Sequence, residues 1–98
     1  MIDLDIKYLD EIKEILKKHV PECKVIAYGS RVTGKAKKYS DLDLAIIGDR
    51  EIEMKRIIEL EDELQNSDIP IRVEILDWHT ISDSFKEIIM NKYEVLID

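Results

Sequence analysis

The sequence of 98 residues lacks the features that build covalent cross-links and membrane spans. Its single cysteine, Cys23, excludes an intrachain disulfide, and no CxxC motif or Cys/His cluster offers a zinc site. The longest aliphatic run, Leu44 to Ile47, falls far short of the roughly 20 apolar residues of a transmembrane helix. No signal peptide is evident. We therefore expect a cytoplasmic protein that does not associate with a membrane.

Positive charge is also scarce. Lys and Arg number 15 against 22 Asp and Glu, which gives a formal net charge of −7. Direct nucleic-acid binding is disfavoured, because an acidic protein repels the phosphate backbone. Apolar residues, in contrast, make up 45% of the chain, enough for a folded core. The length fits one domain, residues 1–98, with three or four strands and a few helices.

Hydrophobic periodicity predicts alternating helices and strands. The predicted elements are helices over 3–20 and 50–66, strands over 24–28, 41–47 and 70–76, and a last helix with Phe85, Ile88 and Ile89. In the second helix we expect Met54 and Ile58 to point inward. Thr80 with Asp83 resembles the N-cap signature of the last helix. The order α-β-β-α-β-α, with a short helical turn between the first two strands, indicates an α/β (α+β) fold: a small mixed β-sheet flanked by helices.

The central stretch YGSRVTGKAKKYSDLDLAII contains two overlapping motifs that handle phosphate. The first resembles a P-loop, since Gly29 is followed by four residues and then by Gly34 and Lys35. Ala36 replaces the Ser or Thr that would bind magnesium. The next strand begins at about Asp41, too soon for the long helix that a P-loop must open. We therefore reject the P-loop interpretation.

The second motif is Gly29-Ser30, ten residues, and then Asp41-Leu42-Asp43. The Gly-Ser pair ends an apolar strand, and the two acids open the next one. Residues two apart in a strand point to the same side, so Asp41 and Asp43 present two carboxylates together. Adjacent anions repel each other unless a cation lies between them, and magnesium is the usual cation where phosphates share the site. The motif predicts a site for a metal and a phosphate.

This pattern is similar to the signature of the polymerase-beta-like nucleotidyltransferase superfamily, and the small size resembles its minimal nucleotidyltransferase (MNT) branch. The resemblance implies the fold of that superfamily and Mg²⁺-dependent transfer of a nucleoside monophosphate, AMP from ATP, with two Mg²⁺ ions. It implies that Gly29 and Ser30 bind the triphosphate and that Asp41 and Asp43 are the catalytic acids that hold the metal. Arg31 is a further nucleotide-binding candidate, with a surface arginine as the alternative.

Members of this superfamily usually add a third acid from a neighbouring strand. Glu74 is the preferred candidate for a third catalytic and metal-binding residue, because it alternates with apolar Val73 and Ile75. Asp77, at the end of the same strand, is the second candidate. The structural alternative for Glu74 is an ion pair with Arg72, which shares its side of the strand.

The small size leaves no room for a platform that binds the acceptor. The resemblance therefore implies a separate helical partner of the HEPN type, encoded nearby, with this chain as an antitoxin that adds AMP to a tyrosine of the partner. Two alternatives remain: transfer to a small hydroxylated molecule with a helical subunit, or a catalytically silent module that binds its partner. For docking we expect the acidic helix 50–66 or the segment around Trp78, Phe85 and Tyr93.

Overall fold

Four strands form a mixed sheet with helices on both faces. The computed structural model describes all residues, 1–98. The elements in chain order are α1 (Ile6–His19), β1 (Lys24–Tyr28), α2 (Ser30–Thr33), β2 (Leu42–Ile47), α3 (Met54–Gln65), β3 (Val73–Asp77), the 3-10 turn η1 (Trp78–Thr80), α4 (Asp83–Asn91) and β4 (Glu94–Ile97). The strand order is β3-β2-β1-β4, in which β1 is antiparallel to both neighbours and β2 is parallel to β3. The predicted fold class is confirmed.

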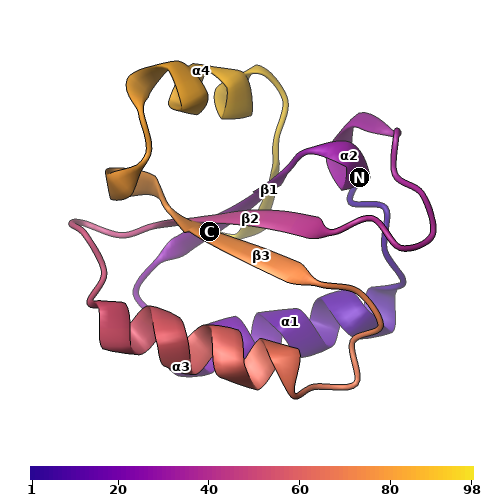
Figure 1. Cartoon of the computed structure of the whole chain (residues 1–98), viewed down its shortest axis with the longest axis horizontal. Helices are drawn as coiled ribbons and strands as arrows, with labels where there is room; N and C mark the ends of the chain where they lie inside the picture. The colour runs from indigo at the N-terminus through magenta and orange to yellow at the C-terminus, as the bar shows by residue number, and fades with distance from the viewer.

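The main core lies between one face of the sheet and the pair α1 and α3, which run side by side beneath it (Figure 1). The amphipathic stripe of α1 supplies Ile12 and Leu16, both fully buried, and α3 supplies Leu60. The strands contribute alternate residues, such as Leu42 and Leu44 of β2. Asp43, which lies between these two, must therefore face the opposite side of the sheet.

The opposite face carries α4 and a smaller apolar cluster built on Ile26, Ala45 and Ile89. In Figure 1, α4 lies above the sheet, and α2 lies beside it at the end where β2 begins. That end also holds Tyr28, the register partner of Asp43. The residues that carry the sequence motif thus lie together at one end of this face.

Several expected boundaries differ from the structure. The sequence pattern predicts no helix or strand over residues 93–97, yet β4 pairs there with β1. The second long helix begins at Met54 instead of residue 50, and its Met54 and Ile58 are 70% and 56% exposed. Ser82, not Thr80, caps α4 by accepting a hydrogen bond from the Phe85 N–H. None of the helices has the length and apolarity needed to cross a bilayer.

Candidate active site

The turn after β1 depends on a glycine. Gly29 has φ +80° and ψ −159°, a backbone conformation that residues other than glycine rarely adopt. A Cβ atom added at Gly29 would overlap the carboxylate oxygen Oδ2 of Asp43. The Gly29 carbonyl then starts α2, accepting hydrogen bonds from the N–H groups of Val32 and Thr33 at 3.0 Å each. The turn thereby brings its backbone against an acidic side chain and leads directly into Ser30.

The central pair of carboxylates comes from two neighbouring strands. Asp43 of β2 and Glu74 of β3 are register partners in the parallel ladder, so their side chains leave the sheet on the same face about 5 Å apart. Asp41 precedes β2 by one residue and is partly buried. Burial raises the pKa of Asp43 to about 6, with further contributions from the negative charges of Glu74 and Asp41. The structure thus brings Asp43 and Glu74 together as the sequence predicts.

Asp77 lies at the other end of β3. Its register partner is Ile46, three residues beyond the pair of Asp43 and Glu74. Its Oδ2 accepts from the Ile52 N–H at 2.8 Å, and its Oδ1 accepts from the His79 N–H at 3.0 Å. Both carboxylate oxygens therefore hold neighbouring backbone in place. Of the two candidates for the third acid, only Glu74 lies next to the Asp-x-Asp motif.

Glu74 does not form the ion pair proposed as its structural alternative. Arg72 is exposed, and no ion pair joins it to Glu74. The Glu74 carboxylate instead adds its negative charge to that of Asp43. An unneutralised pair of carboxylates is more typical of a binding site than of a packing contact.

Arg31, a candidate for nucleotide binding, lies inside the fold beside the loop between α2 and β2. The residue is buried, and its guanidinium donates only to backbone carbonyls. These are the carbonyls of Asp3 (2.6 Å), Ser40 (2.9 Å), Lys38 (3.0 Å) and Lys37 (3.3 Å). Four of its five N–H groups are thus occupied in the fold. Arg31 shapes the loop between α2 and β2, and the expected contact with phosphate stays a prediction for its remaining N–H.

Tyr28 is a residue of the site that sequence reasoning missed, because it was read only as the end of a strand. It pairs with Asp43 across the antiparallel ladder, and its ring packs edge-on against Phe85 of α4 at a centroid distance of 5.9 Å. Burial raises the pKa of the Tyr28 phenol, and the charges of Asp43 and Glu74 raise it further. The phenol therefore stays protonated as a potential hydrogen-bond donor. Its position directly before Gly29 was the signal available in the sequence.

The donor chemistry of the site fits a hard divalent cation. Asp43, Glu74 and Asp41 offer only carboxylate oxygens, the ligand type that magnesium prefers. Burial, and after it the negative charges of Glu74 and Asp41, raise the pKa of Asp43, and a bound cation would favour its ionised form. No three His, Cys, Asp or Glu side chains of the chain are grouped as a ready-made metal cluster, so the carboxylates are not preassembled around a metal position.

The segment from Gly29 to Lys35 lacks the geometry of a P-loop. Gly34 ends α2 in the left-handed conformation, with φ +82°. The helix that follows Gly29 is only four residues long, and β2 runs antiparallel to β1. A P-loop requires a long helix and a parallel crossover at this point. The structure confirms that Gly34 and Lys35 do not form a P-loop.

Comparison with known proteins agrees with this geometry. The family model for polymerase beta nucleotidyltransferases matches residues 10–98. The chain is 46% identical over 95 residues to a Haemophilus influenzae protein named "Probable protein adenylyltransferase MntA", a match that spans 97% of this chain and 83% of the relative.

Solved structures show the same fold. A chain from a crystal structure of a toxin–antitoxin complex with AMP-PNP superposes with a TM-score of 0.77 at 20% identity, over 90% of this chain and 71% of that one. A chain from a complex of a tri-AMPylated Shewanella oneidensis HEPN toxin with an MNT antitoxin superposes with a TM-score of 0.69 at 16% identity, over 95% and 71%.

A mixed sheet with a Gly-Ser turn beside strand-borne carboxylates defines a nucleotidyltransferase. The chain belongs to the polymerase beta nucleotidyltransferase family, which the family model and the 46% identical relative both show.

Proposed function

We propose that this protein transfers AMP from ATP to a hydroxyl group of a partner protein and thereby acts as an antitoxin. The observation that carries the proposal is the Gly29-Ser30 turn packed against Asp43, with Glu74 in register on the next strand. The relative at 46% identity is named a probable protein adenylyltransferase, which supports the proposed transfer of AMP to a protein. A HEPN-type toxin is the proposed partner and a tyrosine the proposed acceptor.

In the proposed reaction, the acceptor oxygen attacks the α-phosphorus of ATP. A new bond forms between this oxygen and the phosphorus, the bond to the β-phosphate oxygen breaks, and pyrophosphate leaves. The hydroxyl proton passes to a carboxylate of the site. Asp43 and Glu74 lie in register on neighbouring strands, so this pair of carboxylates offers the acceptor for the proton.

The chain's own groups divide the remaining tasks. Backbone N–H groups at the Gly29 turn and the Ser30 hydroxyl bind the triphosphate, since glycine permits a close approach. Asp41, Asp43 and Glu74 would hold Mg²⁺, which when bound supplies positive charge to balance the phosphates. The buried Arg31 keeps the loop that leads into Asp41 in one conformation.

The proposal is tested by incubating the purified protein with labelled ATP, Mg²⁺ and the HEPN-type protein encoded beside it. We expect label on the partner, its loss in Asp43→Asn, and a tyrosine as the modified residue by mass spectrometry. Label on a small hydroxylated molecule alone would establish the alternative substrate. Neutralisation of the toxin by Asp43→Asn without any transfer would show a module that acts through binding only.

A further inference from the structure

One edge of the sheet is open beside the proposed active site. β3 pairs with β2 on one side and with no strand on the other, and Figure 1 shows it uncovered at the front. The Arg72 carbonyl accepts a hydrogen bond from the Leu42 N–H at 3.0 Å, so it points toward β2. In a trans peptide the next N–H, that of Val73, points the opposite way. The free edge therefore presents backbone donors and acceptors without partners in the sheet.

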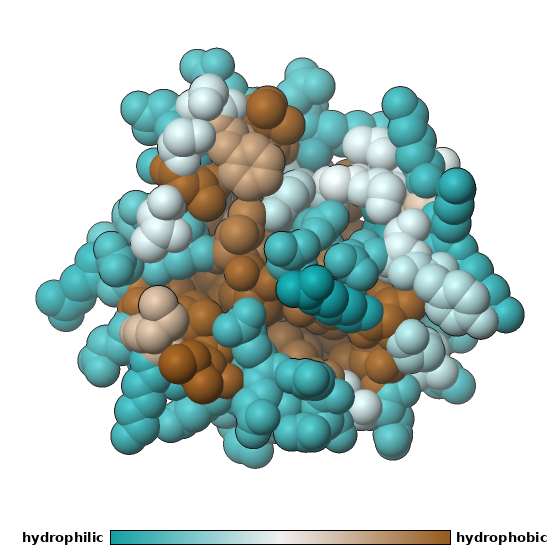
Figure 2. Space-filling model, in the orientation of Figure 1, coloured by the Kyte–Doolittle hydropathy of each residue, from teal (hydrophilic) through white to brown (hydrophobic).

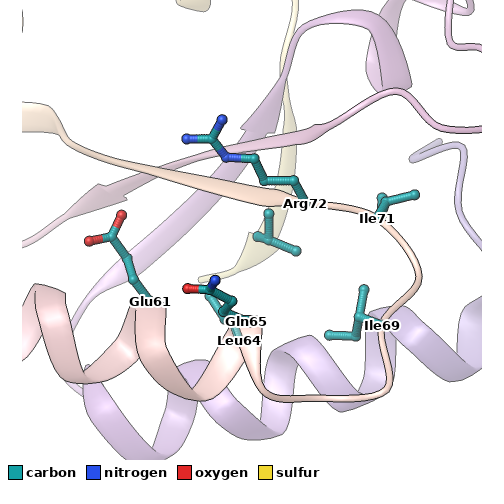
Figure 3. Close-up of a pocket in the computed structure, with 7 residues that line it drawn as sticks. Glu61, Leu64, Gln65, Ile69, Ile71 and Arg72 are labelled. Atoms are coloured by element: carbon teal, nitrogen blue, oxygen red, sulfur yellow. The ribbon is translucent and has the colours of Figure 1, made fainter.

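A groove of about 450 Å³ runs between this edge and the C-terminal half of α3 (Figure 3). Four of its seven lining residues are aliphatic: Leu64, Ile69, Ile71 and Val73. The polar lining residues are Glu61, Gln65 and Arg72. In Figure 3, Glu61 reaches from α3 toward β3, whereas the Arg72 guanidinium points to the side away from α3. An edge strand beside a groove that accepts side chains is the arrangement that binds an extended peptide as an additional strand.

We propose that the free edge of β3 and this groove bind an extended segment of the acceptor protein as a fifth strand. The inference rests on the proposed function, because it assigns the site that holds the acceptor. An extended polypeptide meets both requirements of the surface: its backbone pairs with the β3 edge, and its side chains fill a groove lined by both aliphatic and polar residues.

The register of β3 predicts which residues the segment carries. Glu74 faces the active site, whereas Val73 lines the groove and Ile75 is buried against the main core. Side chains on neighbouring strands share a face when they lie opposite each other. The residue opposite Glu74 therefore enters the active site and carries the acceptor hydroxyl, and its two neighbours point toward α3.

These two neighbours meet different environments. The one opposite Val73 faces Leu64 and the aliphatic end of the groove and is aliphatic. The other lies farther along β3, on the side where Glu61 extends from α3 (Figure 3), and is basic. The sequence expected at the docked strand is aliphatic–tyrosine–basic in the direction parallel to β3, or the reverse order in the antiparallel direction. Charge complementarity with a chain of net charge −7 also favours a basic segment.

The test is peptide binding in the absence of ATP and metal. A short fluorescent peptide centred on Val-Tyr-Lys is titrated with the full chain and followed by anisotropy. Two further peptides have the same side chains but are N-methylated at every second backbone amide. One peptide carries the methyl groups on the odd-numbered residues and the other on the even-numbered residues, and these two sets are the two frames. We expect one frame to bind at least tenfold more weakly, because those amides face β3, and the other frame to bind as the parent does. No binding of the parent up to millimolar concentration, or equal binding of both frames, overturns the proposal.

A protein variant provides a second test of the same edge. Val73→Pro removes the N–H that points away from the sheet and leaves the Leu42 bond to Arg72 in place, as proline is tolerated on the open side of edge strands. Val73→Ala keeps that N–H and is the matched control. We expect the proline variant to bind the peptide at least tenfold more weakly than the alanine variant. Equal affinities would overturn the proposal. Since no nucleotide is present, these results are separate from any failure of AMP transfer.

Discussion

The absence of a side chain at Gly29 is required for two reasons, the backbone conformation of the turn and the position of Asp43. The backbone conformation, with φ +80°, excludes most other residues, and the Asp43 carboxylate occupies the space that a Cβ would need. The sequence motif predicted that Gly29 lets a phosphate approach the backbone closely. The structure adds that the same glycine permits close approach of an acid. This turn is therefore sensitive to substitution even before nucleotide binds.

We predict that Gly29→Val damages transfer more than Ser30→Ala does. A side chain at Gly29 meets strain of about 1–3 kcal/mol and displaces Asp43. Removing the Ser30 hydroxyl leaves the backbone donors of the turn in place, and we expect a loss of about 100-fold in transfer rate. Transfer assays and denaturation curves of both variants measure this order. The reverse ranking would contradict the assignment of this turn.

We predict that Asp43→Asn abolishes transfer yet stabilises the metal-free protein. In the folded state the Asp43 pKa lies at about 6, above the ordinary value of 3.8, so its ionisation destabilises the fold above about pH 6. This destabilisation fades as the pH falls from 6 toward 3.8. The variant should gain about 1 kcal/mol at pH 7.5 in EDTA, after allowance for partial solvent exposure. Asp10→Asn, the same change at an exposed acid that forms no ion pair, is the control. A less stable Asp43→Asn protein would show that the carboxylate repulsion is absent.

At the scale of elements, local patterns predicted the strands that carry the motif. Residues 24–28 and 41–47 are short apolar runs next to a glycine or an acid pair, and they became β1 and β2. β4 was missed because a run such as Glu94–Ile97 at the end of the chain looks the same in a helix or a strand. Its state is decided by pairing with β1, distant in sequence.

Tertiary contacts also moved the start of α3. Residues 50–53 stay outside the helix, where Ile52 is buried and its N–H donates to Asp77. Their helical spacing could not reveal an acceptor 25 residues away. Likewise, nothing in the local sequence of the lysine-rich loop before Asp41 indicates that Arg31 binds its carbonyls.

We predict that Arg31→Met destabilises the protein by about 2–4 kcal/mol. The methionine keeps much of the apolar volume but removes the partly buried hydrogen bonds that the guanidinium donates to the loop carbonyls. Hydrogen exchange should accelerate in residues 34–41 before the rest of the fold. The matched control is Arg50→Met, because Arg50 is exposed and forms no ion pair. If both variants are equally stable, Arg31 does not hold the loop.

At the scale of the whole molecule, the two surfaces expected to dock a partner differ in character. The exposed side of α3 is acidic, and part of it borders the groove beside β3. In Figure 2, hydrophobic residues gather over α4 at the top of the visible face and again over the left part of α3. The exposed apolar residues include Ile88 of α4 and Met54 and Ile58 of α3. A partner that reaches the active site would meet both charge and apolar surface.

The acids of α3 are not equivalent as contacts for a basic partner. Glu63 is already engaged, because its Oε1 accepts from Lys18 at 2.9 Å and lies 2.8 Å from His19. These bonds lower the Glu63 pKa and tie α3 to α1. Glu59, Glu61 and Asp62 are exposed and form no ion pair. A charge-reversal test must therefore change these three and leave Glu63 intact.

We predict that replacing Glu59, Glu61 and Asp62 together by lysine slows association with the partner about tenfold or more at low salt. The acidic side of α3 attracts a basic surface over long range, and this steering acts on the association rate. The difference should shrink as ionic strength rises and the Debye length falls below about 10 Å. Stopped-flow or surface-binding kinetics at two salt concentrations measure both effects.

The control reverses Asp10, Glu14 and Asp49, which are equally free of ion pairs but lie on α1 and in the turn after β2. This variant has the same net charge as the α3 variant, so it separates the local field of α3 from the overall charge of the molecule. If the two variants slow association equally, net charge alone governs the encounter. If the α3 variant associates at the wild-type rate, the partner approaches another surface, and the apolar residues of α4 become the next to be substituted.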